Sequence, residues 1–165
     1  MTFKDSSEIA CKINKNLHKY NWSGEKELKI LVVDGMGGGI GKAIVETLKK
    51  NDNGIDCEIL AVGTNSLATA AMLKAGADDG ATGENAVVYN AERATFIIGP
   101  MGIIIGNSMH GEISPAMAAA ISCSDAHKIL LPVSKCNASI LGITDGPLSS
   151  FFPEMISILK SHKGE

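Results

Sequence analysis

The chain has 165 residues, of which 45% are hydrophobic and 20% charged, enough for one domain with a substantial core and too few for two. Its net charge of −3 and aromatic content of 4% exclude the basic field and base-stacking surface typical of nucleic-acid binding. No apolar run approaches the roughly 18 residues of a membrane span, and the polar start lacks the apolar core of a signal peptide. We therefore expect a cytoplasmic protein with neither a nucleic-acid nor a membrane partner.

The four cysteines form no Cys-x-x-Cys pair and have no histidine at metal-ligand spacing. This pattern predicts reduced thiols and no metal site.

Residues 1–27 are more polar than the rest and are predicted to be an N-terminal extension of the domain at 28–165. Ile9, Ile13 and Leu17 recur every four residues, which indicates a short helix. Two interpretations stay open: the extension lies on its own domain or frays from it, or it is an arm that packs on a second subunit.

The stretch from residue 29 to residue 50 is predicted to form a strand, a glycine turn and a helix. Residues 29–34 are apolar up to Asp34, residues 35–41 hold five glycines in seven positions, and an apolar stripe of helical period follows. Without Cβ atoms the turn lets a ligand approach the backbone, and the helix start offers unpaired N–H groups and a positive dipole end. Such a turn is typical of an anion site, most often for phosphate.

Further elements alternate along the chain between apolar runs and helical stripes. Strands are predicted at residues 57–62, 80–82, 95–98 and 128–132, and helices at 66–74, 84–93, 115–123 and after the turn at 145–147. A sixth strand is predicted at 140–143, and it must be antiparallel or leave the sheet edge because a parallel return needs about a dozen residues. The pattern predicts an α/β fold, a doubly wound and mainly parallel sheet covered on both faces.

In such sheets ligands bind beyond the carboxyl ends of the strands, where the strand order reverses. Polar residues and glycines gather at those predicted ends, and we predict that they bind a phosphate-containing cofactor. The predicted binding residues are Asp34, Gly35, Met36, Gly37, Gly38, Gly39, Ile40, Gly41, Gly63, Thr64, Asn65, Thr82, Gly99 and Pro100. Asp34 has two open interpretations, orientation of a ligand or metal-bound water and hydrogen bonding to the N–H groups of its own loop.

Catalytic candidates are sparse. His110 and Glu112 belong to a polar loop that would suit a lid, and Cys136 lies beside a lysine that favours the thiolate. Asp34 is the fourth candidate. Each also has a plain structural interpretation, as a solvated loop residue, a half-buried thiol or a turn carboxylate.

The glycine turn fits one phosphate motif better than the others. A P-loop would need glycine where Met36 stands and a hydroxyl where Ala43 stands, and both mismatches at functional positions disfavour it. The spacing Gly35, Gly39 and Gly41 resembles the opening of short-chain dehydrogenases, which implies NAD(P) or another nucleotide. The Tyr-x-x-x-Lys pair of that family is missing, and no acidic residue ends the second strand to hold a ribose.

A second resemblance covers almost everything from Lys29 onward. The chain resembles a small bacterial family, common in anaerobic Firmicutes, whose function is unknown and whose fold is read as Rossmann-like. The resemblance lies in the segments 34–45, 63–69, 72–77, 80–86, 130–132 and 136–137. It implies a single Rossmann-like domain and a bacterial cytoplasmic setting, and it implies no activity. The extension before Lys29 departs from that family.

Two functions from different classes stay open. In the first, the protein is an enzyme or cofactor carrier that holds a nucleotide or dinucleotide at its glycine loop. In the second, it is a non-catalytic module that senses a small phosphate compound through a partner or homodimer, which the small-residue helix at 115–123 favours.

Overall fold

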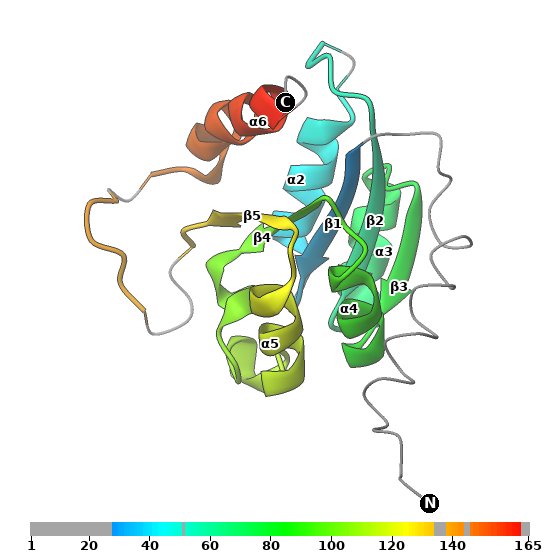
Figure 1. Cartoon of the computed structure of the whole chain (residues 1–165), viewed down its shortest axis with the longest axis vertical. Coiled ribbons are helices and arrows are strands. Elements are labelled where there is room, and N and C mark those ends of the chain that lie inside the picture. The colour runs from blue at the N-terminus through cyan, green and yellow to red at the C-terminus, as the bar shows by residue number, and fades with distance from the viewer. Residues whose placement is uncertain (1–27, 51, 134–137, 144–145, 163–165) are drawn as a thin grey trace, which may run out of the picture.

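The structure, a computed structural model, describes residues 28–50, 52–133, 138–143 and 146–162. The predicted extension at 1–27 and the candidate Cys136 lie outside these residues. Within them the chain folds as an α/β sandwich with one five-stranded sheet and five α-helices (Figure 1).

All five strands are parallel, in the order β3-β2-β1-β4-β5. The strands are β1 (Leu28–Asp34), β2 (Cys57–Gly63), β3 (Asp79–Thr82), β4 (Phe96–Pro100) and β5 (His127–Leu131). The register places Asp34 beside Gly63 and Gly63 beside Thr82, so the carboxyl ends of β1, β2 and β3 are level. The chain leaves β1 toward β2 on one side and later returns to β4 on the other, which makes the β1–β4 boundary the point where the strand order reverses.

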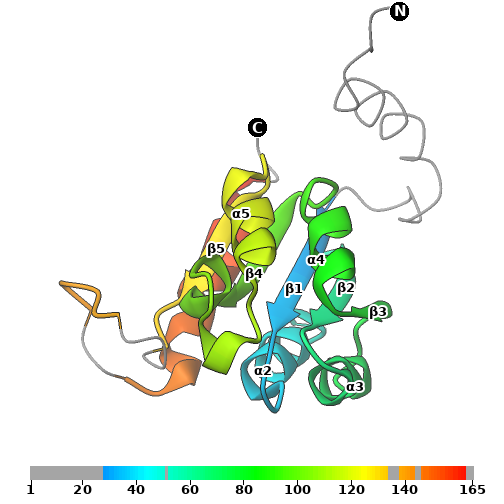
Figure 2. The same cartoon turned by 90° about the horizontal axis from the view of Figure 1, so that it is seen from below.

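Helices cover both faces of the sheet (Figure 2). The helices are α2 (Gly39–Leu48), α3 (Ser66–Lys74), α4 (Glu84–Ala91), α5 (Pro115–Cys123) and α6 (Phe152–Ser161). Ile44, Met72 and Leu159 bury α2, α3 and α6 against one face, and Val87 and Ile121 bury α4 and α5 against the other. The strands are apolar on both sides because both sides are covered.

Two helices are capped at their N-termini by side chains. The side chain of Asn65 accepts a hydrogen bond from the N–H of Ala68 at 2.9 Å, and that of Ser114 accepts one from the N–H of Met117 at 3.2 Å. Helix α4 begins after Gly83, and the side chain of Thr82 lies 2.7 Å, Oγ1 to Oγ1, from that of Thr69.

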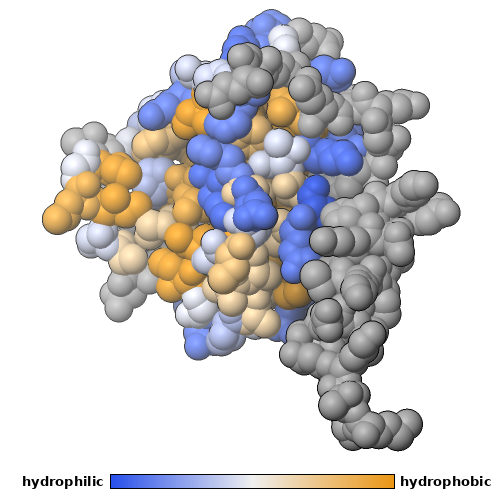
Figure 3. Space-filling view, in the orientation of Figure 1, coloured by the Kyte–Doolittle hydropathy of each residue, from blue (hydrophilic) through white to orange (hydrophobic). Residues whose placement is uncertain are grey.

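The predicted sixth strand is absent from residues 138–143 of the structure. Residues 141 and 142 form a turn in which Gly142 takes a φ of 85°. A left-handed residue at that point interrupts an extended strand, and Leu141 is left 95% exposed. The apolar side chains of this segment appear at the left edge of the molecule in Figure 3.

The segment between β4 and α5 contains two short 3₁₀ helices, η1 (Met101–Ile104) and η2 (Met109–Gly111). A third, η3 (Leu148–Phe151), leads into α6. Among the helices of the described ranges, none has the length and apolar character needed to cross a membrane.

Candidate functional site

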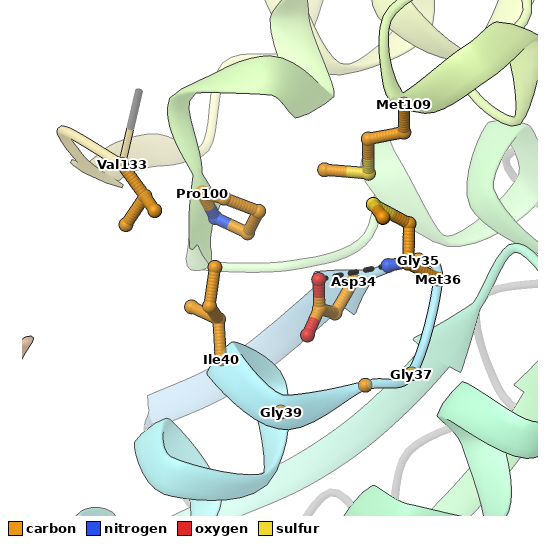
Figure 4. Close-up of a pocket in the computed structure, with 10 residues that line it drawn as sticks. Asp34, Gly35, Met36, Gly37, Gly39, Ile40, Pro100, Met109 and Val133 are labelled. Carbon is orange, nitrogen blue, oxygen red and sulfur yellow. Dashed lines mark hydrogen bonds between the residues drawn. The ribbon is translucent and has the colours of Figure 1, made fainter. Parts of the chain in front are cut away.

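A pocket of about 300 Å³ lies where the strand order reverses, beyond the carboxyl ends of β1 and β4 (Figure 4). Ile40, Pro100 and Val133 line one side, Met36 and Met109 line the other, and the glycine loop forms the floor. The complete lining is Asp34, Gly35, Met36, Gly37, Gly38, Gly39, Ile40, Pro100, Met109 and Val133. Parallel sheets typically bind their ligands at this place.

Asp34 caps α2 from the end of the preceding strand. The helix begins after Gly38, which has no side chain with which to cap it. Asp34 replaces that cap, because its carboxylate accepts from the N–H of Gly35 at 2.8 Å and from that of Gly41 at 2.7 Å. Of the two interpretations of Asp34, the structure therefore shows hydrogen bonding to its own loop.

The Asp34 carboxylate is almost completely buried, with 3% of the residue exposed. Burial raises its pKa above the ordinary value of 3.8, hydrogen bonds from the backbones of Gly41, Gly35 and Ile40 oppose this rise, and the charge of Glu112 adds to it. The Asp34 carboxylate consequently stabilises its own loop, and little of its surface is open to a ligand.

Glu112 reaches the glycine loop from the segment after β4. Its Oε2 atom accepts from the N–H of Met36 at 2.8 Å, from the side-chain amide of Asn65 at 2.9 Å and from the hydroxyl of Thr64. The Thr64 hydroxyl lowers the pKa of Glu112 most, burial opposes this, and Met36, Asn65 and the charge of His110 lower it further. A charged carboxylate therefore joins the glycine loop to the end of β2.

Two N–H groups of the loop differ from the others. Met36 donates to Glu112, Gly38 donates to the carbonyl oxygen of Gly35, and Gly35 and Gly41 donate to Asp34. Gly37 and Gly39 have no acceptor within the described ranges. A Cβ atom placed on either would meet nothing within 4 Å.

The remaining glycines of the predicted site are required for packing. A Cβ on Gly38 would lie 2.6 Å from the Cα of Ala68, and one on Gly41 would lie 2.4 Å from the sulfur of Met72. Gly63 and Gly99 are equally closed, with backbone atoms of Thr69 and Val33 at 2.5 and 2.3 Å. The glycine-rich pattern thus combines two roles, close packing of α2 and an open surface at residues 37 and 39.

The segment carrying Glu112 has an unusual backbone. Asn107, Met109 and His110 have φ values of 63°, 53° and 58°, in the left-handed region that L residues seldom adopt. The N–H of Asn107 donates to the carbonyl of Ile113 at 2.7 Å, which closes the segment into a compact loop. This geometry turns Met109 into the pocket and Glu112 toward the glycine loop.

The structure separates the other predicted site residues. Thr64 and Asn65 contact Glu112, whereas Thr82 contacts Thr69 and lies outside the pocket lining. His110 is exposed and is not among the lining residues. In the described part of the chain, no group of three His, Cys, Asp or Glu residues is placed to hold a metal ion.

Sequence reasoning did not place Met109 and Val133 in the pocket, nor Glu112 at the end of β2. A methionine such as Met109 is typical of a core position. Val133 is an apolar residue that follows a strand, with no polar side chain to indicate a binding site. Only the polar character of the loop pointed to Glu112, because its partners Thr64 and Asn65 lie 48 and 47 residues earlier.

Residues 29–163 match a family model described as "Domain of unknown function (DUF3842)". Neither the search of curated proteins nor that of solved structures gave a match.

Proposed function

This chain belongs to the DUF3842 family, a domain of unknown function, and we propose that it binds a nucleotide or dinucleotide in the pocket at the start of α2. The phosphate accepts hydrogen bonds from the N–H groups of Gly37 and Gly39. The apolar walls receive the organic part of the ligand. In this proposal the domain is Rossmann-like, which the strand order β3-β2-β1-β4-β5 and the position of the glycine loop support.

The observation that carries the proposal is the pair of exposed glycines Gly37 and Gly39. Both residues line a pocket whose other walls are mainly apolar, and their N–H groups have no acceptor within the described ranges. A ligand that covered them without pairing them would lose about 1–3 kcal/mol for each buried N–H. The ligand therefore needs an acceptor at this point, and phosphate at a helix N-terminus supplies several.

The two carboxylates near the loop do not exclude an anionic ligand. Each is already met by N–H or O–H donors, three of them on a single oxygen of Glu112. The partial positive charge of the helix start also acts in favour of an anion at this point.

A non-catalytic, ligand-responsive module is the second candidate. Among the described residues that line the pocket, Asp34 is the only ionisable one, and its oxygens accept hydrogen bonds from its own loop. Binding without chemistry suits such a lining. Turnover of a bound cofactor in a redox assay would decide for an enzyme, and saturable binding with unchanged ligand would decide for the module.

The test is a thermal-shift screen of the full chain with nicotinamide, flavin, adenine and guanine nucleotides and sugar phosphates, followed by calorimetry. A ligand at 100 times its Kd adds about 2.7 kcal/mol of stability, which corresponds to a rise in Tm of about 5 to 10 °C in a domain of this size. We expect such a rise with at least one nucleotide.

The matched variants are Gly39→Ala and Gly106→Ala. Both positions are exposed, and neither Cβ meets an atom closer than 3.4 Å. Gly39→Ala places a methyl group on the open surface of the loop, and we expect it to lose most of the ligand-induced rise while Gly106→Ala keeps it. A flat screen, or equal rises in both variants, would contradict the proposal.

A further inference from the structure

Glu112 presents a carboxylate of which one oxygen is fixed and the other is not engaged. Oε2 accepts all three hydrogen bonds, from Met36, Thr64 and Asn65. Oε1 has no hydrogen-bond partner within the described ranges. Three donors on one atom orient the group, so Oε1 is a preorganised acceptor beside the glycine loop.

The position of this carboxylate is informative. Thr64 and Asn65 directly follow β2, and the register places the end of β2 level with Asp34 at the end of β1. In dinucleotide-binding α/β folds, an acidic residue at the end of the second strand accepts hydrogen bonds from the ribose hydroxyls. Here that position holds uncharged residues, and a carboxylate from a segment almost 50 residues later occupies the space next to them.

We infer that Glu112 is the ribose-binding residue of the proposed nucleotide site: Oε1 accepts a hydrogen bond from the 2′-hydroxyl of a ribose and excludes a 2′-phosphate. The inference rests on the proposed function and adds the class of ligand, a nucleotide with an unmodified ribose diol. The pocket with Pro100 and Val133 lies on the β4 and β5 side of the loop, whereas Glu112 lies on the β2 side. A ligand that joins both would cross the loop at Gly37 and Gly39.

The charge of Glu112 accounts for the proposed selectivity for a 2′-hydroxyl over a 2′-phosphate. The lowered pKa of Glu112 keeps it charged at neutral pH, when a carboxylate accepts hydrogen bonds and donates none. It therefore attracts a hydroxyl and repels a phosphate. A hydrogen bond to a charged group corresponds to roughly 10- to 100-fold in affinity.

The test compares four probes on the full chain by calorimetry: ADP, 2′-deoxy-ADP, NADH and NADPH. Wild-type protein should bind ADP about tenfold or more tightly than 2′-deoxy-ADP, and NADH more tightly than NADPH by at least as much. In Glu112→Gln, ADP should fall to the level of 2′-deoxy-ADP, with no further loss on removing the hydroxyl, and the NADH–NADPH difference should close. Glu84→Gln, at an exposed glutamate in the first turn of α4, is the matched control and should behave as wild type.

Each other outcome overturns the inference in a recognisable way. Equal weakening of all four probes in Glu112→Gln would mean that Glu112 only supports the loop. Tighter binding of all four would mean that its carboxylate occupies the place of the ligand. Wild-type binding without discrimination would reject the inference and leave the proposed function standing, and no binding of any nucleotide would reject both. The wild-type comparisons need no variant, so a misfolded Glu112→Gln does not prevent the decision.

Discussion

At the scale of single residues, the pKa values of the two carboxylates that contact the glycine loop shift in opposite directions. Asp34 is enclosed by the fold, so its pKa is raised, whereas the donors around the partly exposed Glu112 lower its pKa. Both oxygens of Asp34 accept N–H groups of its own loop, and one oxygen of Glu112 joins that loop to β2. Asp34 is thus part of the scaffold, and Glu112 is the charged group that the scaffold presents.

The acid dependence of stability should report this difference. Because Glu112 has a folded pKa below its ordinary 4.5, the folded chain binds fewer protons there than the unfolded chain. Its contribution is complete above pH 4.5 and is lost as the pH falls through the lowered value. Asp34, with a raised pKa, acts in the opposite sense, since its contribution falls as the pH rises from its ordinary 3.8 to its folded value.

We therefore expect the stability of Glu112→Gln to fall less than that of wild type when the pH is lowered from about 6 to about 3, a range that brackets the two ordinary pKa values. The midpoint of urea unfolding, measured across that range, checks it, with Glu84→Gln as the matched control. Parallel curves for wild type and Glu112→Gln would contradict the assigned hydrogen bonds.

At the scale of the elements, the β1–loop–α2 unit separates glycines that permit packing from glycines that leave a surface. Gly38 combines a φ of 69° with an Ala68 backbone that a Cβ would approach to 2.6 Å. We expect Gly38→Ala to destabilise the fold by about 2–4 kcal/mol, from strain in the backbone and displacement of α3. Gly37→Ala meets open space and should change stability by less than about 0.5 kcal/mol.

Chemical denaturation of the two variants measures this contrast, and equal stabilities would show that α3 does not hold the loop as the structure has it. Gly37→Ala should in addition weaken nucleotide binding, because its methyl group enters the face on which the phosphate is proposed to lie. The same type of substitution thereby tests packing at Gly38 and binding at the adjacent Gly37.

The elements that the sequence predicts well are those with local signals. The apolar run that ends at Asp34 and the helices at 66–74 and 115–123 depend on patterns of neighbouring residues, and all three are found in the structure. The strand predicted at 140–143 was wrong because a short apolar run has the pattern of a strand whether or not a sheet edge pairs with it. In the structure, the left-handed conformation of Gly142 interrupts an extended strand in this segment.

At the scale of the whole molecule, the site depends on contacts that sequence spacing does not express. The glycine turn and the ends of the strands are predictable, since parallel strands bring their carboxyl ends to one edge. The approach of Glu112 to Thr64 and the entry of Met109 into the pocket are not, because they depend on left-handed backbone at Asn107, Met109 and His110. Topology therefore predicts the location of the candidate site, while the long-range packing of one loop determines which side chains meet there.

The chain divides at residue 28 into an N-terminal segment and the domain. All five strands and both hydrophobic clusters are built from residues between Leu28 and Leu159, so these residues contain a complete two-sided core. A chain that begins at residue 28 should therefore unfold cooperatively, with a Tm within about 4 °C of the full chain, which corresponds to roughly 1 kcal/mol in a domain of this size.

Circular dichroism on heating measures the stability of the shortened chain, and light scattering after gel filtration measures its mass. If residues 1–27 only extend the domain, both chains should have the same number of subunits. If they are an arm that packs on a second subunit, the shortened chain should lose mass by a factor of two while keeping its fold. Loss of cooperative unfolding would contradict the independence of the core, because the sheet would then need the extension to form.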